Sequence, residues 1–484
     1  MKKNNGINFD NTYTNLDPKL YSMISPNNYV NPDLVIYNST LASDLGIDID
    51  FLKSAQGLSF LSGSSKEFGP YFSQAYAGHQ YEHFTMLGDG RALMLGEQIT
   101  PTSKRFDLQL KGSGRTPYSR RGDGKATLSS MLREYLISEA MNGLGVPTTR
   151  SLAVVETGEM IQRVNFEKGA ILTRVASSHI RVGTFEYAKV YGSKETVQEL
   201  ADYTIDRHYP TLDKSENKYI ELLREIIRTQ ASLIAKWQSV GFIHGVMNTD
   251  NVLISGETID YGPCAFMNHY DPKTVYSSID ANGRYAYQNQ PYIASWNISR
   301  FAEAILELLD ESQEKAIYIA NEELKKFGKQ YKKYWLENMS LKLGIKNPTD
   351  EDEIVVNDLL TIMNKYRADY TNTFSALTKG KFENIVFYDT EDWTEWFKKW
   401  TRALGYRRAD VTGRIEVMKQ ANPTVIPRNH IVEKALLEAV QFNDYGLFHQ
   451  LLDKVSNPYD YYVKHDDAFT RPTDEENYKT YCGT

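Results

Sequence analysis

The residues with the clearest chemical potential lie between His244 and Gly262, in the segment HGVMNTDNVLISGETIDYG. This segment combines a His-Gly turn, an Asp-Asn pair and an Asp-Tyr-Gly at the spacing of a phosphotransfer loop. In such loops an Asn and a second Asp hold divalent cations against nucleotide phosphates, while a nearby carboxylate accepts the proton of the attacking hydroxyl. Asn251 and Asp260 fit the metal-ligand roles, because Mg²⁺ suits two protein oxygens completed by phosphate and water. The segment therefore predicts a nucleotide and metal site.

A short hairpin is predicted between these two metal ligands. Residues 252–254 are apolar and β-prone, Ser255 and Gly256 are typical of a turn, and residues 258–259 lead back. A hairpin of this kind would return Asp260 to the side of Asn251.

The third position of the loop departs from the usual pattern. Small-molecule kinases with a similar His-Gly loop carry their catalytic Asp there, whereas this chain has Val246, which cannot accept a proton. The nearest replacement is Asp250, which we predict to be the catalytic base. Two alternatives remain open: a kinase-like core that has lost activity, and an ordinary Asp-Asn turn. The second leaves the His-Gly and Asp-Tyr-Gly groups unexplained.

Three further elements precede this loop in the order found in protein kinases. They are a glycine-rich turn at residues 87–91, Lys111 at the end of an alternating strand at residues 106–111, and Glu134 in a helix expected over residues 127–141. In such folds the turn brings amides to phosphate, the Lys contacts phosphate, and the Glu holds the Lys in place. Each piece alone is common. Their order together predicts a kinase-like nucleotide site.

A second glycine-rich and basic segment follows Lys111, with GSGR at residues 112–115 and RRGDGK at residues 120–125. Flexible amides with arginine side chains suit polyphosphate binding, and a solvated basic loop explains the pattern equally well. Arg174 and Arg181 add two guanidiniums seven residues apart. Taken alone, such arginines are typical of surface or ion-pairing residues.

Size and composition bound the class of protein. A chain of 484 residues exceeds the usual size of a single core, so two lobes or domains are expected. A formal net charge of −7 and a pI near 5.8 argue against a nucleic-acid partner. The sequence contains neither a signal peptide nor the roughly 18 apolar residues of a membrane span, which predicts a cytoplasmic protein without a membrane partner. Cys264 and Cys482 match no zinc spacing.

The distribution of patterns along the chain predicts an α+β fold in which a β-rich part precedes an α-rich part. Helices are expected over residues 220–237 and over much of 299–342 and 430–453. The tryptophans and Phe of residues 393–400 have helical spacing, which favours packing over base stacking. The predicted divisions are an N-terminal extension at 1–65, a β-rich lobe at 66–190, a helical lobe with the catalytic and metal loop at 191–330, and a helical C-terminal extension with a cysteine-containing tail at 331–484.

With these residues in view, the chain resembles the selenoprotein O family over most of its length. The matching blocks are LGDGRA, FDLQLKGSGRTPYSRRGDGKA, REYLISEAM, LTRVASSHIRVGTFEY, GFIHGVMNTDN, DYGPCAF and NPTVIPRNH. The resemblance implies a two-lobed protein-kinase-like fold that binds ATP in a flipped orientation with Mg²⁺ or Mn²⁺. It implies transfer of AMP to Ser, Thr or Tyr hydroxyls of proteins, this chain included, with release of pyrophosphate. UMP transfer from UTP is implied as well.

The resemblance also implies roles for individual residues. Lys111 and Glu134 would form an ion pair, Asp250 would accept the proton, and Asn251 with Asp260 would hold the metal. The implied nucleotide-binding residues are Gly88, Gly90, Arg91, Lys111, Asp123, Gly124, Glu134, Arg174, Arg181 and Asp260. The arginines suit the charge of a pyrophosphate leaving group. A γ-phosphoryl kinase that releases ADP, and a nucleotide-binding pseudokinase scaffold, remain as alternatives.

The C-terminal tail resembles the family too, since a selenocysteine or cysteine lies a few residues from the end of its members. Here the residue is Cys482. Bacterial relatives can carry a second cysteine after the metal-binding Asp. Cys264 lies in that segment, four residues after Asp260, which is earlier than in the relatives. The resemblance therefore raises a Cys264–Cys482 redox pair, with two inert thiols as the alternative.

Overall fold

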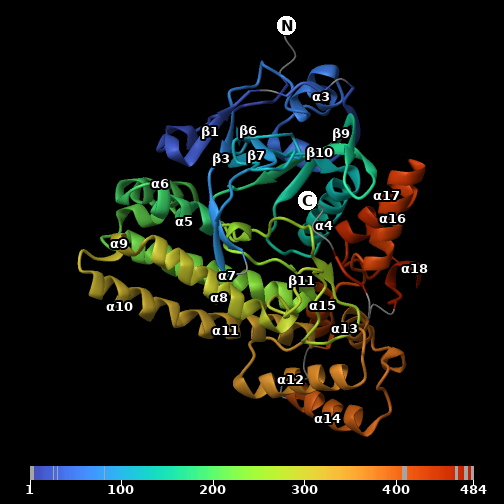
Figure 1. Ribbon diagram of the computed structural model, residues 1–484. Helices are drawn as coiled ribbons and strands as arrows, with labels where there is room; N and C mark the ends of the chain where they lie inside the picture. Colours follow the sequence, from blue (N-terminus) through green and yellow to red (C-terminus); the bar gives the residue numbers. More distant parts are fainter. Residues whose placement is uncertain are drawn as a thin grey trace.

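An antiparallel sheet dominates the first third of the chain in the computed structural model, which describes residues 5–25, 27–29, 31–80, 82–405, 411–463, 467–473 and 478–480. From edge to edge its strands are β1 (Tyr21–Ile24), β3 (Tyr71–Gln74), β6 (Ala92–Ile99), β7 (Arg105–Lys111), β10 (Phe166–Ala176), β9 (Arg150–Gln162) and β2 (Asp33–Tyr37), with β8 (Ala126–Thr127) paired to β10. A separate hairpin of β4 (Ala77–Gln80) and β5 (His83–Met86) leaves the sheet and reaches the helices below it (Figure 1).

The two faces of the sheet carry different side chains. Helices α1 (Ser39–Leu45), α2 (Ile49–Leu52) and α3 (Ala55–Leu61) cover one face and share an apolar cluster with Leu108 and Leu110 of β7. The alternation predicted for this strand is confirmed. Its polar residues are also buried, and Gln109 and Lys111 line a cavity on the opposite face.

Helix α4 (Leu128–Gly143) packs on the strands β9 and β10. Thr127 caps it, because the Thr127 hydroxyl accepts from the amide of Ser130 at 3.3 Å. The helix predicted over residues 127–141 is confirmed, and it carries Glu134 at its buried centre.

Below the sheet, the chain is mainly helical (Figure 1). The helices are α5 (Val182–Tyr191), α6 (Lys194–His208), α7 (Lys218–Val240), α8 (Gln290–Ala304), α9 (Leu306–Leu309), α10 (Gln313–Leu324), α11 (Lys326–Lys342), α12 (Asp350–Lys365), α13 (Tyr370–Lys379), α14 (Glu391–Gly405), α15 (Val411–Ala421), α16 (Asn429–Phe442), α17 (Gly446–Ser456) and α18 (Asp467–Thr470). Short strands β11 (Phe242–Ile243) and β12 (Ala265–Phe266) pair antiparallel. Single turns of 3-10 helix lie at Tyr13–Asn15, Pro18–Leu20, Pro210–Lys214, Thr249–Asn251, Tyr287–Asn289 and Phe382–Asn384.

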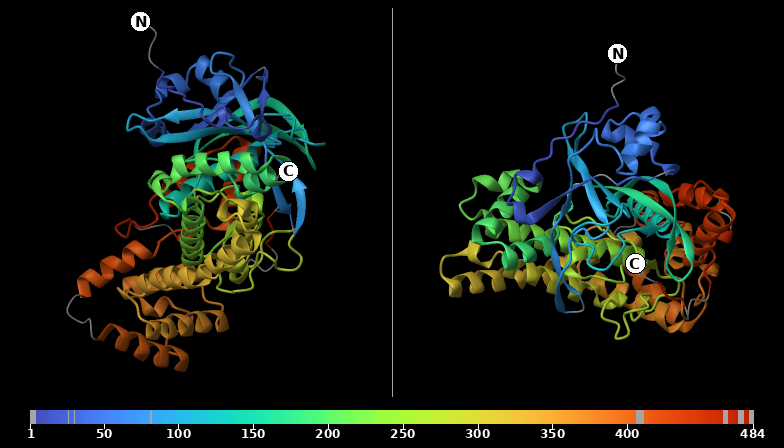
Figure 2. Two further views of the ribbon diagram at one scale, coloured as in Figure 1. Left: turned by 90° about the vertical axis from the view of Figure 1, so that its left-hand side faces the viewer. Right: turned by 45° about the horizontal axis from the view of Figure 1, so that its top comes forward.

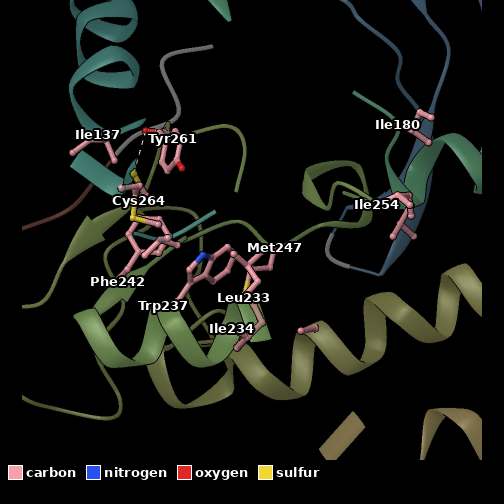
Figure 3. Packing of buried hydrophobic residues seen from close by; sticks show 14 of the residues in the cluster. Ile137, Ile180, Leu233, Ile234, Trp237, Phe242, Met247, Ile254, Tyr261 and Cys264 are labelled. Atoms are coloured by element: carbon pink, nitrogen blue, oxygen red, sulfur yellow. Dashed lines mark hydrogen bonds between the residues drawn. The ribbon is translucent and has the colours of Figure 1, made fainter. Parts of the chain in front are cut away.

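An aromatic core seats the segment 244–262 on helix α7. The ring of Phe242 lies 5.4 Å from that of Trp237 and 6.1 Å from that of Tyr261, between ring centroids. Met247 joins the same cluster (Figure 3). Both ends of the segment are thereby anchored in close-packed side chains, so its polar residues have fixed positions.

Both segments predicted as extensions contact the β-rich part of the chain. Residues 1–65 supply β1 and β2, which lie at the two edges of the main sheet. Helices α16 and α17 pack against α4, far from α12 and α14 (Figures 1 and 2). None of the helices in the described part of the chain combines the length and apolar character needed to cross a bilayer.

A second core holds the lower helices together, and it contains the tryptophans of α14. Trp396 stacks on Trp400 with ring centroids 5.3 Å apart, and its Nε1 donates to the carbonyl of Val355 at 2.9 Å. The prediction that these aromatic residues serve packing is confirmed.

We expect Trp396→Ala to lower the free energy of unfolding by about 3–5 kcal/mol, because it removes a buried ring and leaves the carbonyl of Val355 without its donor. The shift is measured as a change in the midpoint of urea unfolding. Lys398→Ala, at an exposed position on the same helix, is the control. Equal midpoints for the two variants would contradict the prediction.

Candidate active site

A cavity of about 420 Å³ opens between the sheet and the helical segment that follows it. Most of the predicted site residues line it: Gly90, Arg91, Lys111, Arg174, Arg181, Asp250, Asn251 and Asp260. They come from the glycine-rich turn, from strands β7 and β10, from the start of α5 and from the 244–262 segment. The fold thus brings together residues that are widely separated in the sequence.

Asp260 lies at the centre of this site and binds three cations. Its Oδ1 lies 2.5 Å from Lys111 Nζ and 2.7 Å from Arg174 Nη2, and its Oδ2 lies 2.9 Å from Arg181 Nη1. Burial alone would raise the pKa of Asp260, but Arg174, Lys111 and Arg181 outweigh it and hold that pKa well below its usual range. Asp260 is therefore an anion throughout the physiological pH range.

Glu134 binds two of the same cations from the other side. Lys111 Nζ lies 2.8 Å from the Glu134 carboxylate, which is the predicted ion pair, and Arg174 Nη2 also donates to Glu134. Lys111 and Arg174 therefore each bridge Glu134 and Asp260. Because three cations share two carboxylates, this cluster keeps an excess positive charge, which suits phosphate.

Asp250 has a different environment. Its side chain is buried, and its Oδ1 has no hydrogen-bond partner among the described residues. Burial raises the pKa of Asp250 to about 7, while the nearby charge of Arg181 opposes the rise. A carboxyl group with a pKa near the operating pH is suited to accept and release a proton.

The predicted hairpin between Asn251 and Asp260 is wrong. The amide of Val182 donates to the carbonyl of Val252 at 2.9 Å, and the amide of Ile254 donates to the carbonyl of Ile180 at 3.0 Å. Thr258 instead forms a bridge with residue 148. The backbone groups of the two arms are thus hydrogen-bonded to other segments and not to each other. Asn251 and Asp260 still line the same cavity.

The oxygen atoms around this cavity fit a hard divalent cation. The Asn251 side-chain amide donates to the carbonyl of Val246 at 3.0 Å, which fixes the amide and leaves its oxygen as the acceptor end. Within the described ranges no group of three or more His, Cys, Asp or Glu residues is arranged around one metal position. Asn251 and Asp260 would together supply two protein oxygens to a divalent cation, with phosphate and water as its other ligands.

His244 packs inside the protein and holds the loop in place. Its Nε2 contacts the carbonyl of Ile259 at 2.8 Å, and its ring stacks on Trp237 with centroids 5.4 Å apart. It is buried and does not line the cavity.

Four of the predicted nucleotide-binding residues do not line the cavity: Gly88, Asp123, Gly124 and Glu134. A Cβ on Gly88 would lie 2.4 Å from the ring of Tyr118, and one on Gly124 would lie 2.1 Å from the carbonyl oxygen of Gly114, so both glycines shape their turns. Asp123 forms a pair with Arg163 at 2.8 Å. Direct nucleotide contacts from these residues stay predictions.

Sequence patterns missed other residues of the cavity. Asp89 accepts from the amide of Gln74 at 3.0 Å, and burial raises its pKa to about 6. The ring of Tyr76 lies 4.6 Å from the guanidinium of Arg181, and Asn248 accepts from the hydroxyl of Tyr285. Only Asp89 carried a local signal, since it lies within the glycine-rich turn.

Cys264 is buried, and its thiol donates to the carbonyl of Tyr261 at 3.3 Å (Figure 3). Cys482 lies outside the described residues. Near the end of the described chain, the hydroxyl of Thr480 donates to the carbonyl of Pro263 at 2.6 Å, directly before Cys264. The pairing of the two cysteines stays a prediction.

Arg181→Ala is expected to weaken ATP binding at least about tenfold, because a charge-assisted hydrogen bond contributes about 1.5–3 kcal/mol. Titration calorimetry with ATP and Mg²⁺ measures the effect. Arg228→Ala is the matched control, since Arg228 is a half-exposed arginine paired to Glu225 on helix α7. An unchanged dissociation constant in Arg181→Ala would remove Arg181 from the nucleotide site.

The chain is similar to known proteins over most of its length. The family model described as protein adenylyltransferase SelO matches residues 4–456. A protein nucleotidyltransferase YdiU of Brevibacillus brevis is 54% identical over 481 residues, covering 99% of this chain and 98% of the relative. Proteins of the same name from Bacillus cereus and Clostridium botulinum are each 53% identical, over 100% of both chains and over 99% of this chain and 98% of the relative, respectively. The chain therefore belongs to the SelO family of protein adenylyltransferases.

Proposed function

We propose that this protein transfers AMP from ATP to Ser, Thr or Tyr hydroxyls of proteins, itself included, and releases pyrophosphate. The observation that carries the proposal is the convergence of Lys111, Arg174 and Arg181 on Asp260, in the cavity that also holds Asp250. A cationic cluster beside a buried carboxyl group suits displacement at a phosphorus atom with a highly charged leaving group. The names of the relatives support the same reaction class.

The proposed fold is a two-lobed protein-kinase-like one. The sheet at residues 66–190 with helix α4 would be the first lobe, and residues 191–330 would be the second lobe, with terminal extensions at 1–65 and 331–484. The order of the elements supports this division, since the Lys111 strand, the Glu134 helix and the 244–262 loop follow one another as in protein kinases.

In the proposed mechanism, the Asp250 carboxylate accepts the proton of the acceptor hydroxyl. The hydroxyl oxygen forms a bond to the α-phosphorus of ATP, and the bond from that phosphorus to the oxygen bridging to the β-phosphate breaks. Pyrophosphate leaves with the electron pair of that bond. Lys111, Arg174 and Arg181 would neutralise the charge of the leaving group, with Arg91 at the rim of the same cavity.

A divalent metal ion would be held by Asn251 and Asp260 and would neutralise charge on the phosphates. Mg²⁺ and Mn²⁺ both accept such oxygen ligands. UTP is the second nucleotide proposed as a donor, because the phosphate-binding cluster does not contact the base in this mechanism.

One observation favours a different function. Val246 lines the cavity at the position where related kinase loops carry their catalytic Asp, and it cannot move a proton. A nucleotide-binding pseudokinase scaffold is therefore the second candidate, and a γ-phosphoryl kinase is the enzyme alternative.

ATP labelled separately at the α and γ positions distinguishes these functions. We expect protein label from α-labelled ATP alone, with pyrophosphate as the released product. Label from the γ position with ADP released would make the protein a kinase, and binding without label would favour the scaffold.

Asp250→Ala tests the proposed base in the same assay. The variant is expected to lose about 10²- to 10⁴-fold in label transfer while it retains ATP binding. Full activity of this variant would reassign the base.

The rate is expected to depend on pH through Asp250. The reaction requires the carboxylate form, and the pKa of Asp250 is raised from 3.8 to about 7, so the rate should fall about tenfold per pH unit below that value and level off above it. The measurement is kcat/KM between pH 5 and 9. A flat profile below pH 7 would contradict this role.

A further inference from the structure

Two elements, the β4–β5 hairpin and helix α5, meet at the 3-10 turn that carries Asp250. The hairpin belongs to the sheet part of the chain and descends to the helices (Figure 1). Its strand β4 contacts the turn. The proposed mechanism gives this hairpin no role. Its contacts with the turn point to one.

Two glycines on different elements enclose Asp250. A Cβ on Gly78, in strand β4, would lie 2.4 Å from Asp250 Oδ1. A Cβ on Gly183, in helix α5, would lie 2.0 Å from the carbonyl oxygen of Ala77 and 3.3 Å from the Cα of Asp250. Any side chain at either position would therefore displace the turn or the hairpin.

Polar contacts fix the hairpin to the same turn. The amide of His79 donates to the hydroxyl of Thr249 at 2.8 Å, and Nδ1 of His79 pairs with Oε1 of Glu186. Glu186 is buried on helix α5, and the Thr249 hydroxyl also hydrogen-bonds with its carboxyl group. The edge of the His79 ring packs on Trp296, with centroids 5.5 Å apart. One side chain, Thr249, thus connects hairpin and helix immediately before Asp250.

We propose that His79 and Glu186 are positioning residues for AMP transfer, which hold the Thr249–Asn251 turn through Thr249 and keep the Asp250 carboxyl group at the cavity, shielded from water. This inference rests on the proposed function of Asp250. Neither residue lines the cavity, so neither is expected to contact the nucleotide directly.

The test compares His79→Ala, which loses the pairing atom, with His79→Asn, whose amide nitrogen replaces Nδ1. At saturating ATP, we expect His79→Ala and Gly78→Ala to transfer label from α-labelled ATP at least about tenfold more slowly, with ATP dissociation constants within about twofold of the parent protein. His79→Asn should recover most of the rate. His83→Asn, at an exposed histidine on β5 of the same hairpin, should leave the rate unchanged.

One further measurement separates positioning from general structural damage. Amide hydrogen exchange in residues 247–253 should be faster in His79→Ala than in His83→Asn, and this readout does not depend on activity.

Equal rates and equal exchange for His79→Ala and His83→Asn would overturn the inference, as would a parallel loss of ATP binding. These outcomes differ from failure of the proposed function. In that case the parent protein itself transfers no AMP, or Asp250→Ala keeps full activity, while the exchange measurement still reports on the turn.

Discussion

Three buried cations converge on the carboxylate of Asp260, and each comes from a different part of the chain: Lys111 from β7, Arg174 from β10 and Arg181 from the start of α5. A buried charge is costly unless it is paired, and removing one partner leaves the others uncompensated. The cluster therefore fixes the loop against the sheet. The groups proposed to bind phosphate and metal, and the proposed base, all take their positions from this arrangement.

Asp250 and Asp260 line the same cavity, but their pKa values are shifted in opposite directions. Asp260 is surrounded by cations and stays ionised, whereas Asp250 is buried beside Gly78 and has a pKa raised to about 7. Environments that separate the pKa values of two acids in this way assign them different tasks. This difference supports the proposal that Asp260 holds charge and Asp250 accepts the proton.

Local patterns in the sequence predicted the elements whose signals are local. The alternation of residues 106–111 and the periodicity of residues 127–141 located Lys111 and Glu134 correctly, and their ion pair followed from the order of the elements. The hairpin after Asn251 was wrong because its apolar residues pair with residues 180–182 and 148, which a short window of sequence cannot reveal. The contact of Gly78 with Asp250 joins distant segments and left no local signal.

The pairing of Asp260 with three cations also determines how a nucleotide enters. A triphosphate must compete with Asp260 for Lys111, Arg174 and Arg181, while a divalent cation must compete with those side chains for Asp260. Each ligand releases the partner that the other needs, so loading resembles an ion exchange in which the total charge of the cavity changes little. Such linkage is reciprocal: metal favours nucleotide to the same extent that nucleotide favours metal. In the proposed mechanism, nucleotide and metal would thus replace these salt bridges together.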